Sequence, residues 1–352
     1  MESGDRRLKV AVIGAGAFGK NHLRVFSEIQ ASHDVELCAV VDRDPATLLV
    51  ATQLYKVPGF ATLKECLAAG GGLDAASVCV PTVHHASVAE ELLTAGVDVL
   101  IEKPIAASLA EADRLVEVAA QHGRIVQVGH LERFNPAVAE ARNYLNKPMF
   151  FESHRLSVFT PRSLDVDVVL DLMIHDLDIV LSFVGSPVRE VRAVGLPVLS
   201  PKVDIANVRL EFENGCIANF TASRVSTERV RKLRFFQPHQ YLSLDFARQD
   251  LLMIDVTAAA GMDAAQLAAL TAAMQMGQHP SAGLSLRKVP VEQGEPLRLE
   301  ILSFLNAVRT RLVPVVSGED GRAALGLALE ITRAIEVHAK RAGLKMTTLS
   351  SS

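Results

Sequence analysis

Paired cysteines and a surplus of basic residues are both missing from this sequence. The four cysteines, Cys38, Cys66, Cys79 and Cys216, stand alone without C-x-x-C spacing, which argues against a paired-cysteine motif and favours buried thiols in a reducing compartment. Lysine and arginine number 36 against 40 aspartates and glutamates, a formal charge of −4. Without a basic field to hold phosphate backbones, nucleic acid is not expected as the main partner.

Long apolar runs are also missing. Charged residues interrupt every apolar stretch before it reaches the roughly 18 residues that a membrane-spanning helix needs. The segment Met1 to Lys9 carries charged residues of both signs, unlike a targeting peptide in which a basic part precedes an apolar one. We therefore expect a cytoplasmic protein with no membrane partner.

Two globular domains are expected from the length of 352 residues and the hydrophobic fraction of 49%. From Leu8 to His130 short apolar runs alternate with helical patterns, which is typical of strands buried on both faces of a parallel sheet. These runs are Val10–Ile13, Val35–Val41, Ala75–Val80, Val99–Ile101 and Ile125–Val128. The fold class is therefore α/β, with residues 1–129 forming a doubly wound, Rossmann-type dinucleotide-binding domain.

Helix punctuation separates these runs. Asp44-Pro45 is typical of an N-cap followed by the first helical residue, and Gly96 and Gly123 stand where left-handed C-cap residues are favoured. Three pairs have the spacing of a capping box: Thr62 with Glu65, Ser87 with Glu90, and Ser108 with Glu111.

After His130 the pattern changes. A helix-like segment around Val166–Phe183 precedes strand-like runs, and Asn214-Gly215 suits the positive φ angles of a tight hairpin. We expect residues 130–352 to form an α+β domain with a largely antiparallel open sheet, serving substrate binding and oligomerisation. Further predicted elements are strands at Val188–Val194, Asn207–Phe212 and Ile217–Ser223, and helices at Asp263–Met276, Leu297–Leu312 and Gly321–Ala342.

Gly14-Ala15-Gly16-Ala17-Phe18-Gly19 follows the first strand and opens a helix. In this context GxGxxG allows backbone amides to approach a pyrophosphate. A glycine-rich turn without a ligand is the weaker alternative. Dinucleotide contacts are therefore expected from Gly14, Gly16, Ala17, Phe18 and Gly19.

Asp42 ends the second strand about 20 residues after the glycine motif, where a carboxylate can accept hydrogen bonds from the adenosine ribose. Asp42 therefore favours NAD. The neighbouring Arg43 could accommodate a 2′-phosphate or be a solvated loop charge, so NADP stays an alternative.

Two further groups of residues suit proton transfer. Glu102-Lys103-Pro104 ends a strand at its carboxyl edge, where ligands bind in open parallel sheets, although such a triplet can also be a surface ion pair. Asp171 and His175 are spaced i and i+4 in a helical pattern, so the carboxylate can orient the imidazole for acid–base chemistry. A helix-stabilising pair is the structural alternative. A metal site that adds Asp178 is the weaker interpretation, because no complete ligand pattern accompanies it.

A basic cluster lies in the second domain. Strand alternation places Lys232 and Arg234 on one face. A solvated sheet edge or a subunit contact is favoured over phosphate binding. The members of the cluster are Arg224, Arg229, Arg231, Lys232 and Arg234.

Together these motifs resemble those of the Gfo/Idh/MocA oxidoreductases, which oxidise or reduce sugars and cyclitols with NAD(P). The resemblance extends from about Lys9 to the C-terminal helix. Its motifs are Gly14–Gly19 with His22, Pro81-Thr82 with His85, Glu102-Lys103-Pro104, and Asp171, His175 and Asp178 in the pattern D-x-G-x-H-x-x-D. It implies that the cofactor site also includes His22, Pro81, Thr82, His85, Glu102 and Lys103, with Thr82, His85 and Glu102 on the nicotinamide side.

The resemblance also implies catalytic roles. Lys103 and His175 would flank the reacting hydroxyl, with His175 as the base, Asp171 orienting it, and Lys103 polarising the hydroxyl or shuttling its proton. The family often has a cis peptide at the Lys-Pro pair, which an X-Pro bond permits at small cost. Met173 replaces the family's usual glycine, so we expect a narrower or differently shaped substrate pocket there.

Within the family, Gly129–Pro136 and Asp171–Asp176 are most similar to UDP-N-acetylglucosamine 3-dehydrogenases. That resemblance implies NAD-dependent oxidation of the C3 hydroxyl, whose 3-oxo product a transaminase uses on the way to diamino-sugar lipid A. Guanidinium groups match diphosphate oxygens and amides suit sugar hydroxyls. The candidate substrate contacts are therefore Arg133, Asn135, Arg155 and Arg162, with Asp171 and His175; each of the first four also has a purely structural alternative.

Two rival functions stay open. One is another enzyme of the same family acting on inositol or another cyclitol, an aldose or a nucleotide-linked uronic acid. The other is a non-catalytic, dinucleotide-bound sensor or scaffold, against which the joint presence of Lys103, Asp171 and His175 argues. A downstream aminotransferase is the expected functional partner, and the resemblance implies a homodimer or homotetramer formed through the exposed sheet face.

Overall fold

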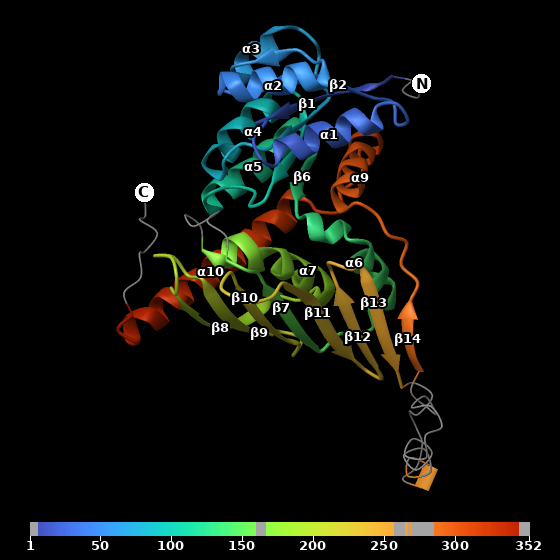
Figure 1. Cartoon of the computed structure of the whole chain (residues 1–352), viewed down its shortest axis with the longest axis vertical. Helices are drawn as coiled ribbons and strands as arrows, with labels where there is room; N and C mark the ends of the chain where they lie inside the picture. The colour runs from blue at the N-terminus through green and yellow to red at the C-terminus, as the bar shows by residue number, and fades with distance from the viewer. Residues whose placement is uncertain (1–5, 160–166, 257–264, 267, 269–284, 345–352) are drawn as a thin grey trace. The chain divides into compact units, whose positions relative to one another are not determined.

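The structure is a computed structural model of the chain, and it describes residues 6–159, 167–256, 265, 266, 268 and 285–344. These residues form two compact units (Figure 1). The first comprises residues 1–134 and 295–326, and the second residues 135–294 and 327–352. The first unit thus includes a late segment of the chain that a single boundary after residue 129 does not assign to it.

The first unit contains a six-stranded sheet in the order β3-β2-β1-β4-β5-β6, and all its neighbouring strands are parallel. This order confirms the predicted doubly wound fold, in which the strand order reverses beside β1. The strands are β1 (Leu8–Ile13), β2 (Val35–Val41), β3 (Gly59–Phe60), β4 (Ala75–Val78), β5 (Asp98–Glu102) and β6 (Val126–Gly129).

Helices of the first unit begin where short polar side chains satisfy their first amides. Asp44 accepts a hydrogen bond from the Thr47 amide at 2.9 Å with Pro45 as the first helical residue, as predicted. Ser108 and Glu111 form the predicted capping box. The helices are α1 (Gly19–Ile29), α2 (Pro45–Tyr55), α3 (Leu63–Ala68), α4 (His85–Thr94), α5 (Leu109–His122) and α9 (Pro296–Thr310), with the 3₁₀ turns η1 (Thr82–His84) and η2 (Leu131–Phe134).

The capping box predicted at Ser87 and Glu90 is wrong. Pro81 leads directly into η1, and η1 continues into α4, so the helix has already begun two residues before Ser87. The Ser87 hydroxyl therefore donates back to the His84 carbonyl at 3.2 Å instead of capping a helix.

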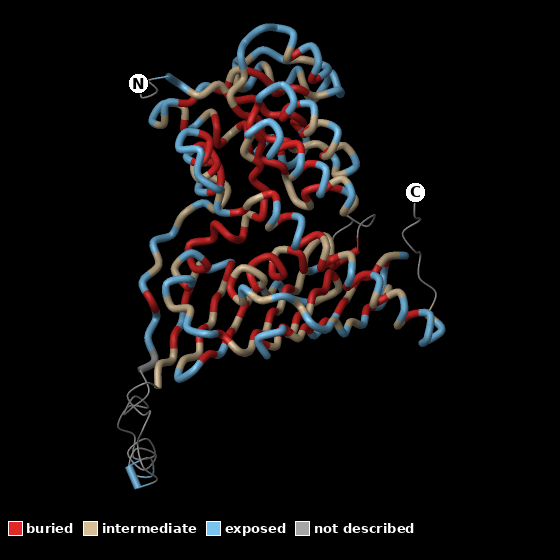
Figure 2. The backbone as a smooth tube through the Cα atoms, turned by 180° about the vertical axis from the view of Figure 1, so that it is seen from behind, coloured by how far each residue is buried: buried red, intermediate tan, exposed pale blue. Residues whose placement is uncertain are grey.

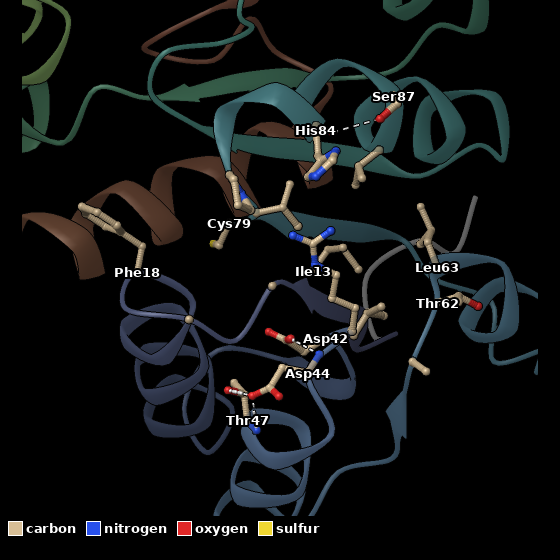
Figure 3. A pocket seen from close by; sticks show the side chains of 18 of the residues that line it. Ile13, Phe18, Asp42, Asp44, Thr47, Thr62, Leu63, Cys79, His84 and Ser87 are labelled. Carbon is tan, nitrogen blue, oxygen red and sulfur yellow. Dashed lines mark hydrogen bonds between the residues drawn. The ribbon is translucent and has the colours of Figure 1, made fainter. Parts of the chain in front are cut away.

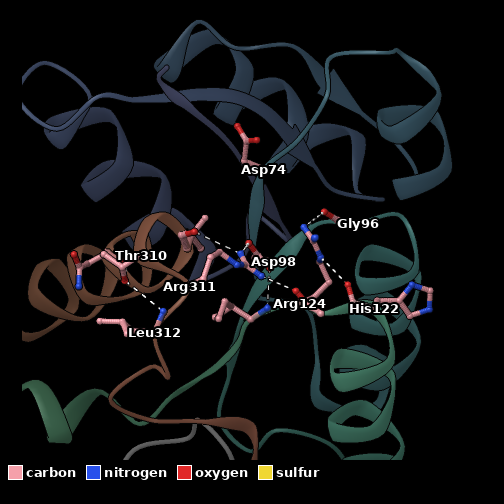
Figure 4. Close-up of polar contacts among 12 residues, drawn as sticks. Asp74, Gly96, Asp98, His122, Arg124, Thr310, Arg311 and Leu312 are labelled. Carbon is pink, nitrogen blue, oxygen red and sulfur yellow. Dashed lines mark hydrogen bonds and ion pairs between the residues drawn. The ribbon is translucent and has the colours of Figure 1, made fainter. Parts of the chain in front are cut away.

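The core of the first unit forms where α1 and α9 pack on the parallel sheet. Most apolar residues of β1 and β2 are buried, and Ile301, Phe304 and Leu305 of α9 join their cluster. Figure 2 shows buried residues along the backbone in red. At the end of α9, Arg311 forms an ion pair with Asp98 at the start of β5 and donates to the Gly123 carbonyl at 2.6 Å (Figure 4). These contacts fix the late segment 295–326 within the first unit.

The second unit contains an eight-stranded sheet in the order β14-β13-β12-β11-β7-β10-β9-β8 (Figure 1). Strands β7 and β10 run parallel, and the other neighbouring pairs are antiparallel. This confirms the predicted α+β fold with a largely antiparallel sheet. The strands are β7 (Phe150–Leu156), β8 (Val188–Leu196), β9 (Ile205–Phe212), β10 (Ile217–Ser223), β11 (Val230–Gln237), β12 (Gln240–Asp245), β13 (Asp250–Asp255) and β14 (Ser285–Val289).

Burial alternates along these strands, so one face of the sheet is packed and the other is partly exposed. The hairpin between β9 and β10 turns at Asn214-Gly215 as predicted, but only Gly215 has a positive φ, of 83°. The Asn214 side chain accepts from the Cys216 amide and holds the turn from within. The helices are α6 (Pro136–Ala141), η3 (Arg142–Tyr144), the π-helix η4 (Val169–Met173) and α7 (Ile174–Val184). Helix α10 (Gly318–Arg341) begins in the first unit and continues into the second after residue 326.

All four cysteines have free thiols; Cys66 and Cys216 are buried, whereas Cys38 and Cys79 are partly buried. No helix in the described part of the chain combines the length and the apolar character needed to cross a bilayer. The helix predicted for Asp263–Met276 lies almost entirely outside the described residues.

Candidate active site

A cavity of about 600 Å³ lies beside the carboxyl ends of the parallel strands in the first unit. Ligands bind at this edge in open α/β sheets. Figure 3 shows the end of β2 and the start of α2 on one side and η1 with the start of α4 on the other. The lining residues are Ile13, Gly14, Gly16, Ala17, Phe18, Val41, Asp42, Arg43, Asp44, Thr47, Ala61, Thr62, Leu63, Cys79, Val80, Pro81, His84, Ser87 and Val88.

The three glycines of the GxGxxG loop meet different surroundings. A Cβ on Gly14 would lie 2.8 Å from the Cys79 carbonyl group, and its φ of +93° already favours glycine. A Cβ on Gly19 would lie 1.8 Å from the Gly14 oxygen, whereas a Cβ on Gly16 would meet nothing within 4 Å. Two glycines thus allow the strand–loop–helix to pack closely, and the third leaves space on the cavity side.

Helix α1 leaves its first backbone amides without a side-chain cap. Phe18 stands at the N-cap position, and the first turn contains no acidic residue. Uncapped amides at a helix N-terminus attract anions. Together with the open space at Gly16, this geometry fits the diphosphate of a dinucleotide.

Asp42 connects two loops at the cavity wall. Its carboxylate accepts hydrogen bonds from the Ala15 amide at 2.7 Å and from the Asp44 amide at 2.9 Å. Each carboxylate oxygen has a further lone pair, so ribose hydroxyls can still donate to it. Arg43 lines the same cavity. Both Asp42, which favours NAD, and Arg43, which could accommodate the 2′-phosphate of NADP, therefore lie at the cavity.

The cavity includes part of the predicted cofactor set. The predicted residues that line it are Gly14, Gly16, Ala17, Phe18, Asp42, Arg43 and Pro81. The predicted residues that are not among its lining are Gly19, His22, Thr82, His85, Glu102 and Lys103. Sequence reasoning missed Ala61, Thr62 and Leu63, which follow β3. Residues that follow each parallel strand lie at this edge of the sheet, so locating β3 in the sequence would have indicated these three residues. Strand β3 has only two residues, however, and shows no hydrophobic run in the sequence.

Buried polar contacts surround the Glu102-Lys103-Pro104 segment, whose Lys103-Pro104 peptide is cis. The His22 imidazole Nε2 lies 2.8 Å from Glu102 Oε1. Burial raises the pKa of the Glu102 carboxyl, but the His22 hydrogen bond and the charges of His22, Lys103 and His85 outweigh burial and hold that pKa below its ordinary value. Glu102 therefore stays ionised beside Lys103.

His85 lies between two backbone carbonyls. Its Nδ1 is 2.8 Å from the Pro104 oxygen and its Nε2 is 2.9 Å from the Val80 oxygen. Burial lowers the pKa of His85, against the opposing effect of these two carbonyls. The neutral ring carries one N–H, so it donates to one carbonyl at a time.

In the second unit, Asp171 and His175 lie across a junction of two helix types. Asp171 belongs to the π-helical turn η4, and His175 is the second residue of α7. The Asp167 carboxylate accepts from the amides of Val169 and Leu170 and so caps this turn. The sequence indicated one regular helix, and a single π turn of this kind is frequent at functional sites.

Three of the candidate substrate contacts have well-defined structural partners. Arg155 is buried and pairs bidentately with Asp176 at 2.9 and 2.7 Å. Asn135 caps α6 through its carbonyl oxygen and donates to the Phe246 carbonyl at 3.0 Å. Arg133 lies 3.7 Å from Asp320, and Arg162 lies outside the described residues. Their contacts with substrate stay predictions.

The basic cluster of the second unit is divided between two environments. Arg224 is buried near Asp204, whereas Lys232 and Arg234 share the partly exposed face of β11. Across the described part of the chain, no group of three or more histidine, cysteine, aspartate or glutamate side chains is placed to hold a metal ion.

Two family models match the chain. Residues 8–130 match the model described as "Oxidoreductase family, NAD-binding Rossmann fold". Residues 129–237 match the model described as "GFO/IDH/MocA C-terminal domain". The two matches follow one another along the chain.

Individual relatives are similar over different lengths. UDP-N-acetylglucosamine 3-dehydrogenase of Acidithiobacillus ferrooxidans is 32% identical over 95% of this chain and 99% of that enzyme. A solved structure of that enzyme superposes with a TM-score of 0.82, covering 94% of this chain and 98% of the other. An inositol 2-dehydrogenase of Acidothermus cellulolyticus is 30% identical over 54% of this chain and 57% of that enzyme.

Family models, relatives and fold agree with the motifs of both units. The first unit contains an NAD-binding Rossmann fold. The second contains an eight-stranded sheet, and several of its strands lie in the residues that match the carboxyl-terminal family model. The chain therefore belongs to the Gfo/Idh/MocA family of oxidoreductases, as an oxidoreductase acting on a hydroxyl group.

Proposed function

We propose that the protein oxidises the C3 hydroxyl of UDP-N-acetylglucosamine with NAD. The observation that carries this proposal is the 32% identity to a UDP-N-acetylglucosamine 3-dehydrogenase across 95% of this chain. Inositol dehydrogenases also match, but over little more than half of the chain. The product would be a 3-oxo sugar nucleotide, the ketone that an aminotransferase needs on the way to diamino-sugar lipid A, in the cytoplasm.

The reaction moves a hydride and a proton to different acceptors. NAD supplies the acceptor for the hydride that leaves C3 with its electron pair. The hydroxyl proton passes to His175, Asp171 orients the imidazole, and Lys103 polarises the hydroxyl oxygen as its C–O bond gains double-bond character. These roles are carried over from the family motifs that the three residues match.

Cofactor preference follows from the end of β2. Asp42 is half-buried at the cavity wall, and its oxygens already accept two amide hydrogen bonds. A 2′-phosphate there would bring negative charge against a carboxylate, whereas ribose hydroxyls would donate to it. We therefore propose NAD as the cofactor that turns over.

The test couples the purified protein to an aminotransferase and glutamate with NAD and UDP-N-acetylglucosamine, because ketone formation is uphill. We expect a diamino-sugar nucleotide only when both enzymes are present. Lys103→Ala and His175→Ala should each lower turnover about 10²- to 10⁴-fold, in the range of acid–base catalysis. His122→Ala, an exposed histidine at the end of α5, serves as the matched control with unchanged turnover.

Two results would overturn the proposal. Unchanged turnover in both the Lys103 and His175 variants removes the assigned chemistry. If no sugar nucleotide changes but a free cyclitol, an aldose or a UDP-uronic acid reduces NAD, the substrate is wrong while the reaction class survives. If no substrate of this panel changes with either dinucleotide, a sensor or scaffold becomes the better interpretation.

A further inference from the structure

The two chain neighbours of Lys103, Glu102 and Pro104, each contact a buried histidine. Its predecessor Glu102 pairs with His22 at 2.8 Å, and the carbonyl of its successor Pro104 lies 2.8 Å from His85 Nδ1. Both histidines are 1% exposed. An imidazole from one helix thus holds the Glu102 side chain, and an imidazole from another helix contacts the Pro104 backbone carbonyl.

Helix α4 and the loop that leads into α1 both contribute residues to the cavity lining of the first unit. His22 lies on α1, which begins at Gly19 at the end of the GxGxxG loop. His85 is the first residue of α4, and its Nε2 lies 2.9 Å from the carbonyl of Val80, a cavity-lining residue. The two imidazoles therefore connect the segment around Lys103 to two elements next to the cavity lining.

Neither histidine is among the residues that line that cavity, and both imidazoles hydrogen-bond to the residues next to Lys103. The surrounding charges suit a fixed arrangement: Glu102 faces His22, Lys103 and His85, while His85 faces Glu102 and Glu111. A buried carboxylate is costly unless it is hydrogen-bonded, and His22 meets that requirement for Glu102.

We propose that His22 and His85 are positioning residues that clamp the segment around Lys103, through the Glu102 side chain on one side and the Pro104 carbonyl on the other. Together they set the Lys103 ammonium group relative to the dinucleotide cavity. This inference rests on the proposed function, in which Lys103 acts on the substrate hydroxyl. In this inference the two motif histidines, His22 and His85, act on the reaction by positioning Lys103 and not by contacting the cofactor.

The experiment compares His22→Leu and His85→Ala with His22→Gln and His85→Asn, which retain a side-chain donor. The series also includes Lys103→Ala, the double variants His22→Leu/Lys103→Ala and His85→Ala/Lys103→Ala, and His122→Ala as the control. The measurements are kcat and KM with NAD and UDP-N-acetylglucosamine, the NAD dissociation constant, and the labelling rate of Lys103 by acetic anhydride, read by mass spectrometry. Labelling requires no substrate.

We expect His22→Leu and His85→Ala to lower kcat about 30-fold with KM and NAD affinity within about threefold, because misplacing a catalytic group by an ångström can cost about 100-fold. The donor-retaining variants should recover most of the loss. Adding either change to Lys103→Ala should cause no further loss, since residues that act as a unit are not additive. Lys103 labelling should change at least about threefold, with Lys9 and Lys20 constant as internal standards.

Different outcomes separate this inference from the proposed function. If Lys103→Ala loses turnover but the histidine variants keep kcat and Lys103 labelling, the clamp is wrong and the proposed function stands. Additive losses in the double variants would show a general structural role and also overturn the clamp. Full turnover in Lys103→Ala would instead overturn the proposed function, and if UDP-N-acetylglucosamine is not a substrate the labelling rates alone decide whether the clamp exists.

Discussion

At the scale of single residues, close approach explains two glycines and open space explains the third. Gly14 and Gly19 face backbone atoms at distances that no Cβ tolerates, whereas Gly16 faces the cavity. The motif predicted these positions because the requirement is local in the chain. By contrast, the contacts of His22 with Glu102 and of His85 with Pro104 join residues that only the folded chain brings together. The sequence could not predict these contacts, and the cofactor role that the resemblance implies for both histidines stays a prediction.

Gly19→Ala and Gly16→Ala test this difference. The Gly19 variant should lose about 1–3 kcal/mol of stability or more, because its methyl group must displace backbone. The Gly16 variant should keep its Tm but bind NAD at least about tenfold more weakly, since its methyl group enters the space left for the diphosphate. Thermal unfolding and NAD titration measure the two effects. Equal losses of stability in both variants would contradict the assignment.

At the scale of elements, the pattern of burial decides which strands were predictable. The runs Val35–Val41 and Ile217–Ser223 coincide with β2 and β10 because apolar residues dominate their buried positions. Strand β7 was missed, because its buried face carries Ser153 and Arg155 and therefore shows no apolar alternation. The π turn η4 was also missed, since hydrophobic spacing does not distinguish it from an α-helical turn.

Helix starts give a paired prediction. Ser108→Ala should lower the stability of the first unit by about 1 kcal/mol, because it removes the N-cap of α5. Ser87→Ala should change stability by less than about 0.5 kcal/mol, since α4 begins before it. Chemical denaturation of both variants measures the difference. A loss of stability in Ser87→Ala larger than that in Ser108→Ala would indicate that Ser87 caps the helix, as its pairing with Glu90 in the sequence suggested.

The buried Arg155–Asp176 pair gives a second prediction at this scale. It joins β7 to α7 immediately beside His175, and the guanidinium also stacks on Phe246. Arg155→Met should cost about 3–5 kcal/mol, because Asp176 would be left as an unpaired buried charge. The double variant Arg155→Met/Asp176→Leu should recover most of that loss in chemical denaturation. If the single and double variants are equally unstable, an unpaired charge on Asp176 does not explain the loss of stability.

At the scale of the whole molecule, the sequence predicted both sheets and the NAD-binding fold but not which part of the chain completes the first unit. Leu297–Leu312 was expected as a closing helix of the second domain, yet α9 contributes Ile301, Phe304 and Leu305 to the core beside β1. The amphipathic pattern of α9 specifies that one face is buried but not which sheet buries it. Only the fold supplies that information.

Oligomeric state is the prediction at this scale. The partly exposed sheet face carries an aromatic group in which Phe236 lies 5.6 Å from Phe150 and 4.9 Å from Tyr241, ring centre to ring centre. We expect a homodimer or homotetramer in which this face is buried, and Phe236→Glu should reduce the mass in light scattering. Val337→Glu, an exposed position on α10, is the matched control. A monomeric wild-type protein would contradict the expectation.

In the proposed function, C3 of the sugar nucleotide loses its hydride to NAD. The most direct measurement uses UDP-N-acetylglucosamine carrying deuterium at C3 and detects the label by mass spectrometry of the reduced dinucleotide. We predict transfer of the deuterium to the nicotinamide, a slower turnover than with the unlabelled substrate, and loss of the signal in His175→Ala. Reduced dinucleotide without deuterium would place the oxidation at another carbon and contradict the account.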